Sequence, residues 1–259
     1  MRFFMFPVAL KIGAITIYWY GVMAAIGFLL AIYVQKFTKE HAKMTDDDTS
    51  NVIFVAMIAG LIGARIFYVV QFFHLFRDNL WNVIRVDQGG LVFYGGFILA
   101  IISLIVYAKI KKIDPVLMFD AITPAMAIGH ACGRVGCFLH GCCFGKPAAF
   151  FGVRYPAGSE AVLKYGEGTL LHPVQLYEAG ANFIAFWFFL KLARNCKRGV
   201  AMSSYFIYYG TTRFLIELLR GDNPHIWGLF TPAQLIGLLL IPTGVILLLY
   251  FKKNAAQNA

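Results

Sequence analysis

The run VIFVAMIAGLIGARIFYVVQFFHLF, residues 52–76, carries one permanently charged side chain, that of Arg65, among apolar and small residues. An α-helix needs about 20 predominantly apolar residues to cross the hydrocarbon core of a bilayer, and this run exceeds that length. It also contains no proline. The run therefore predicts a transmembrane helix.

Six further stretches have the same character. With the first they predict seven spans, at about residues 13–34, 52–76, 91–108, 116–139, 175–190, 200–219 and 231–251. The composition agrees, because 59% of the residues are hydrophobic and only 14% are charged, too few charges to cover a water-exposed domain. The first apolar stretch is too long for a cleavable signal peptide. We expect an all-α, polytopic membrane protein that forms a single domain over residues 1–259.

The positions of lysine and arginine predict the orientation of these helices. With the N-terminus outside, twelve basic residues fall in short cytoplasmic segments and eight in longer external ones. This distribution agrees with the rule that the cytoplasmic loops of membrane proteins carry an excess of lysine and arginine. The C-terminus is then cytoplasmic, and the glycine-rich segment 140–174 forms a small external cap. The net charge of +10 reflects topology, and with no separate basic domain a nucleic-acid partner is not expected.

Three of the 23 lysine and arginine residues lie in neither the cytoplasmic nor the external segments but inside predicted spans. They are Arg65, Arg134 and Arg213. An arginine at membrane depth costs about 2.5–3.5 kcal/mol or more, so it persists where it is paired or lines a wet cavity. The acidic residues at a similar depth are Asp120, Glu178 and Glu217. These six groups predict one polar chamber, with structural ion pairing between helices as the alternative. Arg213 and Glu217 lie four residues apart on one helix and can pair directly, and Tyr209 lies one turn earlier on the same face.

Two glycine-rich stretches interrupt or modify the predicted helices. In Gly89-Gly90-Leu91-Val92-Phe93-Tyr94-Gly95-Gly96, the glycine pairs favour a re-entrant or unwound segment, with close helix packing as the alternative. In residues 133–147, Gly133 and Gly136 allow a headgroup to approach closely, and Arg134 presents a planar fork suited to phosphate.

Cysteines gather around this second stretch, namely Cys132, Cys137, Cys142 and Cys143. Their spacing matches no standard zinc pattern, so we expect no metal and no other cofactor. The adjacent pair Cys142-Cys143 is able to form a disulfide on an oxidising face of a membrane.

Separated blocks along nearly the whole chain carry a family resemblance. They are Trp19-Tyr20-Gly21, Gly63-Ala64-Arg65, the run at 89–96, Gly133-Arg134-x-Gly136, His172-Pro173-x-Gln175-Leu176-Tyr177-Glu178 and Tyr209-Gly210-x-x-Arg213-x-x-x-Glu217-x-x-Arg220. In this order and spacing, the sequence resembles the prolipoprotein diacylglyceryl transferase family of bacterial inner membranes. The resemblance implies transfer of the diacylglyceryl group of phosphatidylglycerol to the lipobox cysteine thiol of a preprolipoprotein, the first step of lipoprotein maturation.

The resemblance also implies roles for individual residues. Arg134 is expected to bind the lipid phosphate, and Arg213, held by Glu217 and Tyr209, to act at the reacting centre, with Tyr94 as a further catalytic candidate. Arginines in a water-poor cavity stabilise a leaving phosphate and lower the pKa of a thiol. The substrate-binding residues implied are Tyr20, Arg65, Gly95, Gly96, Gly133, Gly136, Cys137, His172, Gln175, Tyr177, Glu178 and Arg220.

This sequence departs from the family pattern at a few of these positions. Tyr94 and Tyr18 stand where a histidine is common, Cys137 where asparagine is common, and Cys142 where glutamate is frequent. A tyrosine, with a reference pKa near 10, is a poor general base, so the sequence leaves the base unassigned. Other functions of the protein stay open beside the one that the resemblance implies. They are a paralogous phospholipid-dependent transferase with another acceptor, a thiol–disulfide oxidoreductase that uses Cys142 and Cys143, and a transporter or anion channel.

Overall fold

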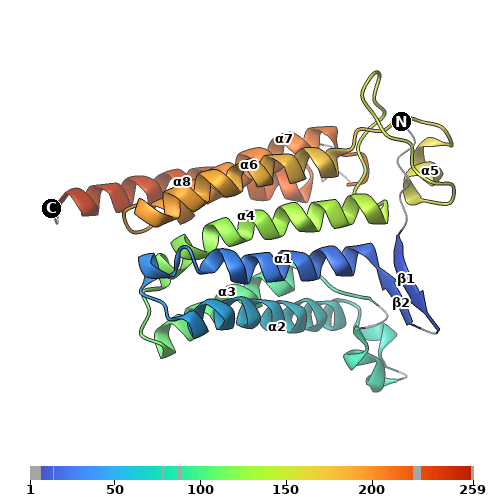
Figure 1. The fold of residues 1–259 in the computed structure, drawn as a ribbon. Coiled ribbons are helices and arrows are strands. Elements are labelled where there is room, and N and C mark those ends of the chain that lie inside the picture. Colours follow the sequence, from blue (N-terminus) through green and yellow to red (C-terminus); the bar gives the residue numbers. More distant parts are fainter. Residues whose placement is uncertain (1–6, 14, 78, 87–88, 224–228, 258–259) are drawn as a thin grey trace. The chain divides into compact units, whose positions relative to one another are not determined.

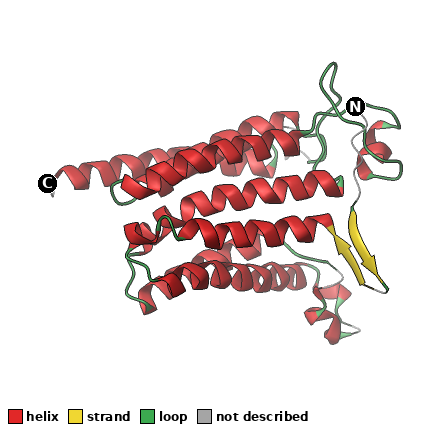
Figure 2. Cartoon of the chain, in the orientation of Figure 1, coloured by secondary structure: helices red, strands yellow, loops and turns green. Residues whose placement is uncertain are grey.

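The computed structural model describes residues 7–13, 15–77, 79–86, 89–223 and 229–257 (Figure 1). Within them the chain is mostly helical, and a two-stranded antiparallel hairpin is the only sheet (Figure 2). The strands are β1 (Val8–Ile12) and β2 (Ile15–Tyr18). The helices are α1 (Trp19–Gln35), α2 (Asp46–Gln71), α3 (Phe93–Ile110), α4 (Pro115–His140), α5 (Glu160–Tyr165), α6 (Val174–Asn195), α7 (Val200–Leu219) and α8 (Pro232–Gln257), with short 3-10 helices η1 (Lys39–Ala42), η2 (Phe73–Leu75) and η3 (Leu80–Ile84).

Each predicted span is occupied by a long helix, with corrections at several ends. Helix α2 ends at Gln71, five residues before its predicted end, whereas α6 and α8 continue five and six residues beyond theirs, to Asn195 and Gln257. At the predicted start of the first helix, Gly13 instead lies in a turn with a φ of 56°, and Ile15–Tyr18 form β2, because the β-branched Ile15, Thr16 and Ile17 favour extended backbone. Helix α2 begins six residues before its predicted span. Thr45 and Asp48 form a capping box there, which satisfies the first backbone N–H groups of the helix.

Among the described residues, α2, α3, α4 and residues 232–254 of α8 are long and apolar enough to cross a membrane, and α1 is a shorter apolar helix. Their outer faces carry large exposed apolar side chains, such as Val70 on α2 (74% exposed) and Leu239 on α8 (69%). Apolar surface of this extent is unfavourable in water and is typical of a membrane-embedded protein. The first six residues, predicted to lie outside the membrane, are not among those described.

The chain divides into two compact units, one of residues 39–118 and one of residues 1–38 with 119–259. In the first unit, α2 and α3 pack through glycines. A Cβ atom on Gly96 would lie 2.6 Å from the carbonyl oxygen of Gly60, and one on Gly63 would overlap the carbonyl oxygen of Gly95. The prediction that the run 89–96 is unwound throughout is therefore wrong from Phe93 onward, where α3 begins. The alternative of close helix packing is confirmed.

In the second unit, Asp120 of α4 lies at the start of α7. Its carboxylate is fully buried and accepts hydrogen bonds from the backbone N–H groups of Gly199 (2.5 Å) and Met202 (2.7 Å), where the helix dipole favours an anion. Arg213 lies about 20 Å further along α7, at 1.5 Å per residue. The prediction that Asp120 shares a chamber with the buried arginines is therefore wrong.

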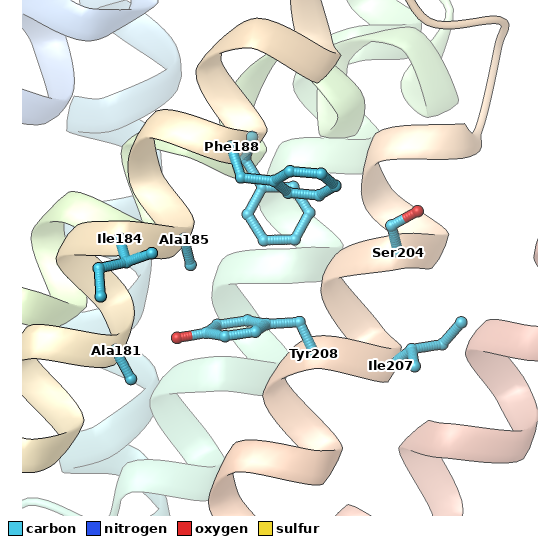
Figure 3. A pocket seen from close by; sticks show the side chains of 8 residues that line it. Ala181, Ile184, Ala185, Phe188, Ser204, Ile207 and Tyr208 are labelled. Carbon is cyan, nitrogen blue, oxygen red and sulfur yellow. The ribbon is translucent and has the colours of Figure 1, made fainter.

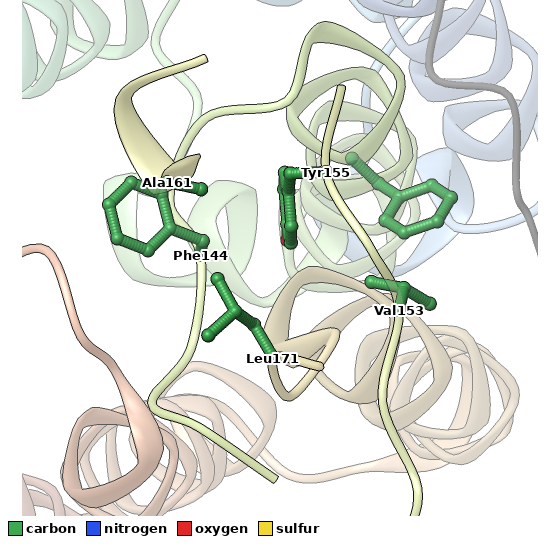
Figure 4. Packing of buried hydrophobic residues seen from close by; sticks show 6 residues of the cluster. Phe144, Val153, Tyr155, Ala161 and Leu171 are labelled. Carbon is green, nitrogen blue, oxygen red and sulfur yellow. The ribbon is translucent and has the colours of Figure 1, made fainter. Parts of the chain in front are cut away.

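Residues 141–173 form a small cap at one end of this unit (Figure 1). Its core is a cluster of buried residues (Figure 4). They are Phe144, Val153, Tyr155, Ala161 and Leu171 of the cap and Phe138 of α4. Backbone hydrogen bonds join its two sides, for example between the N–H of Val153 and the carbonyl of Leu171 (2.9 Å). The predicted cap segment is thus an ordered, packed structure.

Candidate active site

Glu178, in the first turns of α6, joins three helices of the second unit. Its side chain is 3% exposed. Oε2 lies 3.0 Å from Nε of Arg134 on α4 and 3.9 Å from Nη1 of Arg213 on α7. Oε1 lies 3.2 Å from Nε2 of His130, one turn before Arg134. A buried charge is tolerated when it is paired in this way, so one carboxylate fixes the positions of both arginines.

A second carboxylate, that of Glu217, holds the other side of Arg213. Glu217 Oε2 lies 2.8 Å from Arg213 Nη2, and Oε1 accepts a hydrogen bond from the side chain of Asn223. Arg220 lies 4.0 Å from the same carboxylate and forms a bidentate pair with Asp222, with N–O distances of 2.9 and 2.6 Å. We call the charged set the arginine–carboxylate cluster. It comprises Arg134, Arg213, Arg220, Glu178, Glu217 and Asp222.

The two central arginines keep donor groups available. The contacts of Arg134 with Glu178 and with His130 (3.2 Å) are made by Nε, and its terminal nitrogens form no hydrogen bond within the described part of the chain. Nη1 of Arg213 is buried and has no hydrogen-bond partner among the described residues. A buried donor without a partner costs about 1–3 kcal/mol, which an anionic ligand would offset. Two guanidinium groups beside one carboxylate can thus bind a phosphate through several N–H groups.

His130 was not predicted as a member of this site. Its ring lies between Arg134 and Glu178, and 5.7 Å from the ring of Tyr209. Tyr209 in turn stacks on Tyr205 at 6.1 Å. The available signal was the spacing, since residues four apart on a helix share a face and His130 precedes Arg134 by four.

Helix α4 ends in a Schellman motif that gathers the cysteines. Gly141 adopts a φ of 84°, its N–H donates to the carbonyl of Phe138 (3.1 Å), and the N–H of Cys142 donates to the carbonyl of Cys137 (3.2 Å). Cys143 then adopts a φ of 63°. The reversal brings the sulfur atoms of Cys137, Cys142 and Cys143 within 4.8 Å of one another. Spacing alone did not reveal this cluster, because the motif folds the chain back on the last turn of α4.

The neighbours of this turn shift the pKa values of Cys143 and Arg220. Hydrogen bonds with Cys137 and Cys142 lower the pKa of the Cys143 thiol, and the Arg220 and Arg134 guanidinium groups lower it further. Burial lowers the pKa of Arg220, but the hydrogen bonds and charge of Asp222 outweigh it, so the pKa of Arg220 rises and the residue stays charged.

Predicted binding residues of the 172–178 block hold the cap in place. The buried Gln175 donates a hydrogen bond to the carbonyl of Cys142 (2.7 Å) and pairs with the hydroxyl of Tyr155 (2.9 Å). Burial raises the pKa of Tyr155 to about 12, so this hydroxyl stays neutral. Nδ1 of His172 lies 3.3 Å from the hydroxyl of Tyr177. Gln175 therefore joins the cap to the turn that carries the cysteines, while His172 and Tyr177 pair with each other.

Helix α1 packs against α4 at Gly136, on the face of α4 that lies opposite Arg134. A Cβ atom there would lie 3.3 Å from Cα of Tyr20 and 3.2 Å from Cβ of Met23. Tyr20 is close enough to interact electrostatically with Arg134 and with the three clustered thiols. A Cβ atom on Gly133 would meet nothing within 4 Å, so open space lies beside Arg134.

The remaining predicted residues belong to the unit of residues 39–118. Arg65 donates hydrogen bonds to the carbonyls of Val83 (2.7 Å), Gly89 (2.7 Å), Gly90 (3.0 Å) and Asn82. These bonds use four of the five guanidinium N–H groups, so the geometry favours a clamp on the loop before α3 over a lipid contact.

Tyr94 lies in the first turn of α3 and is 45% exposed. Gly95 and Gly96 follow it, in the packing contact with α2 described above. Roles for these three residues in substrate binding or catalysis stay predictions.

A model of the family described as prolipoprotein diacylglyceryl transferase matches residues 7–250. The chain belongs to this family. Among named relatives, the phosphatidylglycerol–prolipoprotein diacylglyceryl transferase of Clostridium botulinum strain 657 is 33% identical over 254 residues, covering 97% of this chain and 99% of the relative. The enzyme of the same name from Clostridium tetani is 32% identical, covering 92% and 95%, and that from Staphylococcus epidermidis is 29% identical, covering 94% and 88%.

Like its family, this chain is a membrane transferase, and an apolar pocket adjoins its charged cluster. The pocket has a volume of about 540 Å³ and lies between α6 and α7 (Figure 3). Its lining residues are Ala181, Ile184, Ala185, Phe188 and Phe189 from α6 and Ser204, Ile207 and Tyr208 from α7. On α6 the pocket residue Ala181 follows Glu178 by three residues, about one turn, and on α7 Tyr208 precedes Arg213 by five residues. In this transferase, charged groups and an apolar groove therefore follow one another along the same pair of helices.

Proposed function

We propose that this chain transfers the diacylglyceryl group of phosphatidylglycerol to the lipobox cysteine thiol of a prolipoprotein. The observation that carries the proposal is the pair Arg134 and Arg213, held on the single carboxylate of Glu178 with donor groups to spare. Such a pair matches a phosphate ester, and the names of the relatives supply the donor and the acceptor.

In the proposed reaction the lipid phosphate binds the terminal nitrogens of Arg134 and Nη1 of Arg213. The acceptor thiol loses its proton to solvent, its sulfur attacks the glyceryl carbon, the carbon–oxygen bond to phosphate breaks, and glycerol phosphate leaves with the electron pair. Negative charge grows on the phosphate as this bond breaks. Guanidinium groups already oriented by Glu178 and Glu217 stabilise that charge without reorganising, which is the main source of catalysis by preorganised donors.

The apolar pocket between α6 and α7 fits an acyl chain of the same lipid. Its lining is almost wholly aliphatic and aromatic (Figure 3), so an acyl chain that moves there from the bilayer stays in an apolar environment. The headgroup would then lie at Glu178 and Arg213 while a chain extends along the two helices.

We further propose that the seven long helices span a bacterial inner membrane, with the N-terminus and the cap outside and the C-terminus in the cytoplasm. The support is the distribution of basic residues. An impermeant thiol reagent tests it in Lys111→Cys and Glu167→Cys variants from which the native external cysteines have been removed. Labelling of intact cells at position 167 and not at 111 is expected, and the reverse pattern would reject this orientation.

The activity itself is tested by restoring lipoprotein modification in a transferase-depleted strain and by transfer to a lipobox peptide with purified protein. Phosphatidylglycerol should be consumed in step with peptide modification. A thiol–disulfide oxidoreductase or a channel would leave the lipid unchanged, so purified protein that consumes no phosphatidylglycerol would reject the proposal.

A further inference from the structure

Three thiols of the second unit lie in the arrangement that a thiophilic metal ion needs. The sulfur atoms of Cys137, Cys142 and Cys143 are within 4.8 Å of one another. Zinc binds thiolate sulfur at about 2.3 Å with tetrahedral geometry, which sets the sulfurs roughly 3.8 Å apart. Small side-chain rotations close that difference.

The backbone that carries these thiols is held on several sides. The Schellman motif fixes Cys142 against Cys137, and the buried Gln175 binds the Cys142 carbonyl at 2.7 Å. The carbonyl of Phe144 accepts a hydrogen bond from the N–H of Gly221 (3.0 Å). Cys143 is held in the left-handed region, which costs a non-glycine residue roughly 1–2 kcal/mol. Such strain is retained where the surrounding structure imposes it, often at functional sites.

The surroundings also suit the charge of a metal–thiolate centre. A divalent ion with three thiolates carries one net negative charge, and the guanidinium groups of Arg134 and Arg220 interact electrostatically with Cys143. Among the described residues, no fourth histidine, cysteine or carboxylate joins this group. Zinc sites with three protein ligands keep a position open for water or substrate, as catalytic zinc sites do, whereas structural sites use four.

We propose that Cys137, Cys142 and Cys143 bind one zinc ion, and that its open position binds the acceptor thiol of the prolipoprotein. This inference rests on the proposed function and names the group that activates its acceptor. The acceptor thiol releases its proton to solvent as its sulfur binds zinc. That sulfur then forms the bond to the glyceryl carbon as the bond from this carbon to the phosphate oxygen breaks, with the electron pair passing to phosphate. The product thioether is a weak zinc ligand and dissociates, and no oxidant or reductant takes part.

The proposal fits the position of Arg134. This residue lies one turn before Cys137 on α4 and interacts electrostatically with both Cys137 and Cys143, while its terminal nitrogens remain available for the lipid phosphate. Acceptor sulfur and leaving phosphate would thus meet on the two sides of one guanidinium group. The zinc ion supplies the thiolate that a tyrosine, with its high reference pKa, is poorly suited to generate.

The binding arm of the test uses reduced, purified full-length protein titrated with Cd²⁺, which gives a sulfur-to-metal charge-transfer absorption. The wild type should bind one ion per chain. Cys143→Ser should weaken binding by more than the roughly 10- to 100-fold that changes outside the ligand set cost. The matched control is Cys132→Ala, a buried cysteine of α4 outside the cluster, and it should bind as the wild type does. A wild type without the absorption, or an unchanged titration in Cys143→Ser, would overturn the metal site.

The activity arm compares protein stripped by a chelator, the same protein reloaded with Zn²⁺, and Cys143→Ser. Stripping and the substitution should each lower transfer about 100-fold at neutral pH. The defect should shrink as pH passes about 8.5, where a free thiol ionises unaided. Stripped protein that transfers at the full rate would overturn the role in acceptor activation. If no metal state transfers lipid, the proposed function fails, while the Cd²⁺ titration still decides the metal site.

Discussion

Replacing Glu178 by glutamine tests whether one carboxylate orients both central arginines. The substitution keeps the shape of the side chain and removes its charge, leaving Arg134 at 3.0 Å and Arg213 at 3.9 Å from a neutral amide. Removing one partner of a buried ion pair costs about 3–5 kcal/mol. The two arginines share the same carboxylate, so their losses do not add. We expect the unfolding temperature to fall by about 6–20 °C, using the scaling for a chain of this size.

The rate of transfer should fall further than stability alone explains. Without Glu178, Arg134 and Arg213 repel each other and no longer aim at one phosphate, and loss of one preorganised donor typically costs about 100- to 1000-fold in rate. Transfer from phosphatidylglycerol to a lipobox peptide is measured at a temperature where the variant is folded, as its melting curve shows. Glu160→Gln makes the same chemical change at an exposed position on α5 and should match the wild type. If Glu178→Gln transfers within about threefold of the wild type, Glu178 does not orient the arginines.

Further substitutions test the central arginines, the glycine contact between α2 and α3, and the hydrogen bond of Gln175. Arg134→Lys and Arg213→Lys should each lose about 30- to 1000-fold in transfer while still inserting, because lysine keeps the charge but not the bidentate fork; near-normal rates in both would leave the arginines as scaffolding. Gly63→Ala should lower thermal stability because its Cβ would overlap α3, whereas Gly60→Ala, whose Cβ would lie 3.9 Å from its nearest neighbour, should not, and equal melting temperatures would contradict the packing. Gln175→Leu should cost about 1–3 kcal/mol by leaving the Cys142 carbonyl without its partner, and unchanged unfolding in denaturant would show that this hydrogen bond contributes little.

The helices of this protein were predictable because their apolar runs are long. Hydrocarbon thickness sets the length, so the predicted span 116–139 agrees with α4 to within one residue at each end. The start of the first span was predicted wrongly because Ile15 and Ile17 continue the apolar run of the helix, and the pattern of a short apolar segment does not separate a helix from a strand. The turn at Gly13 decided between them.

The charged site was predictable in part because buried charge is costly. Counting charges at membrane depth identified Arg134, Arg213, Glu178 and Glu217, and the structure brings these four together. The same count included Asp120, which instead caps a helix, because depth in a membrane does not show which helices meet.

Two contributions to the site, His130 and the cluster of three thiols, are missing from the sequence prediction. His130 is an ordinary residue by type, and only its place one turn before Arg134 relates it to the site. The three thiols meet because the chain reverses at Gly141, and zinc patterns derived from other turns do not describe this one.

The hydrogen bonds that close the cap also set an order of assembly during synthesis. The N–H of Lys146 binds the carbonyl of Leu219 (2.7 Å), and the N–H of Gly221 binds the carbonyl of Phe144 (3.0 Å). These partners leave the ribosome more than seventy residues apart, which at 5–20 residues per second is a delay of roughly 4–15 seconds. During that interval the cap lacks these two closing hydrogen bonds. A newly made chain therefore cannot hold a finished site until α7 has entered the bundle, because α7 also carries Arg213, the second arginine of the central pair.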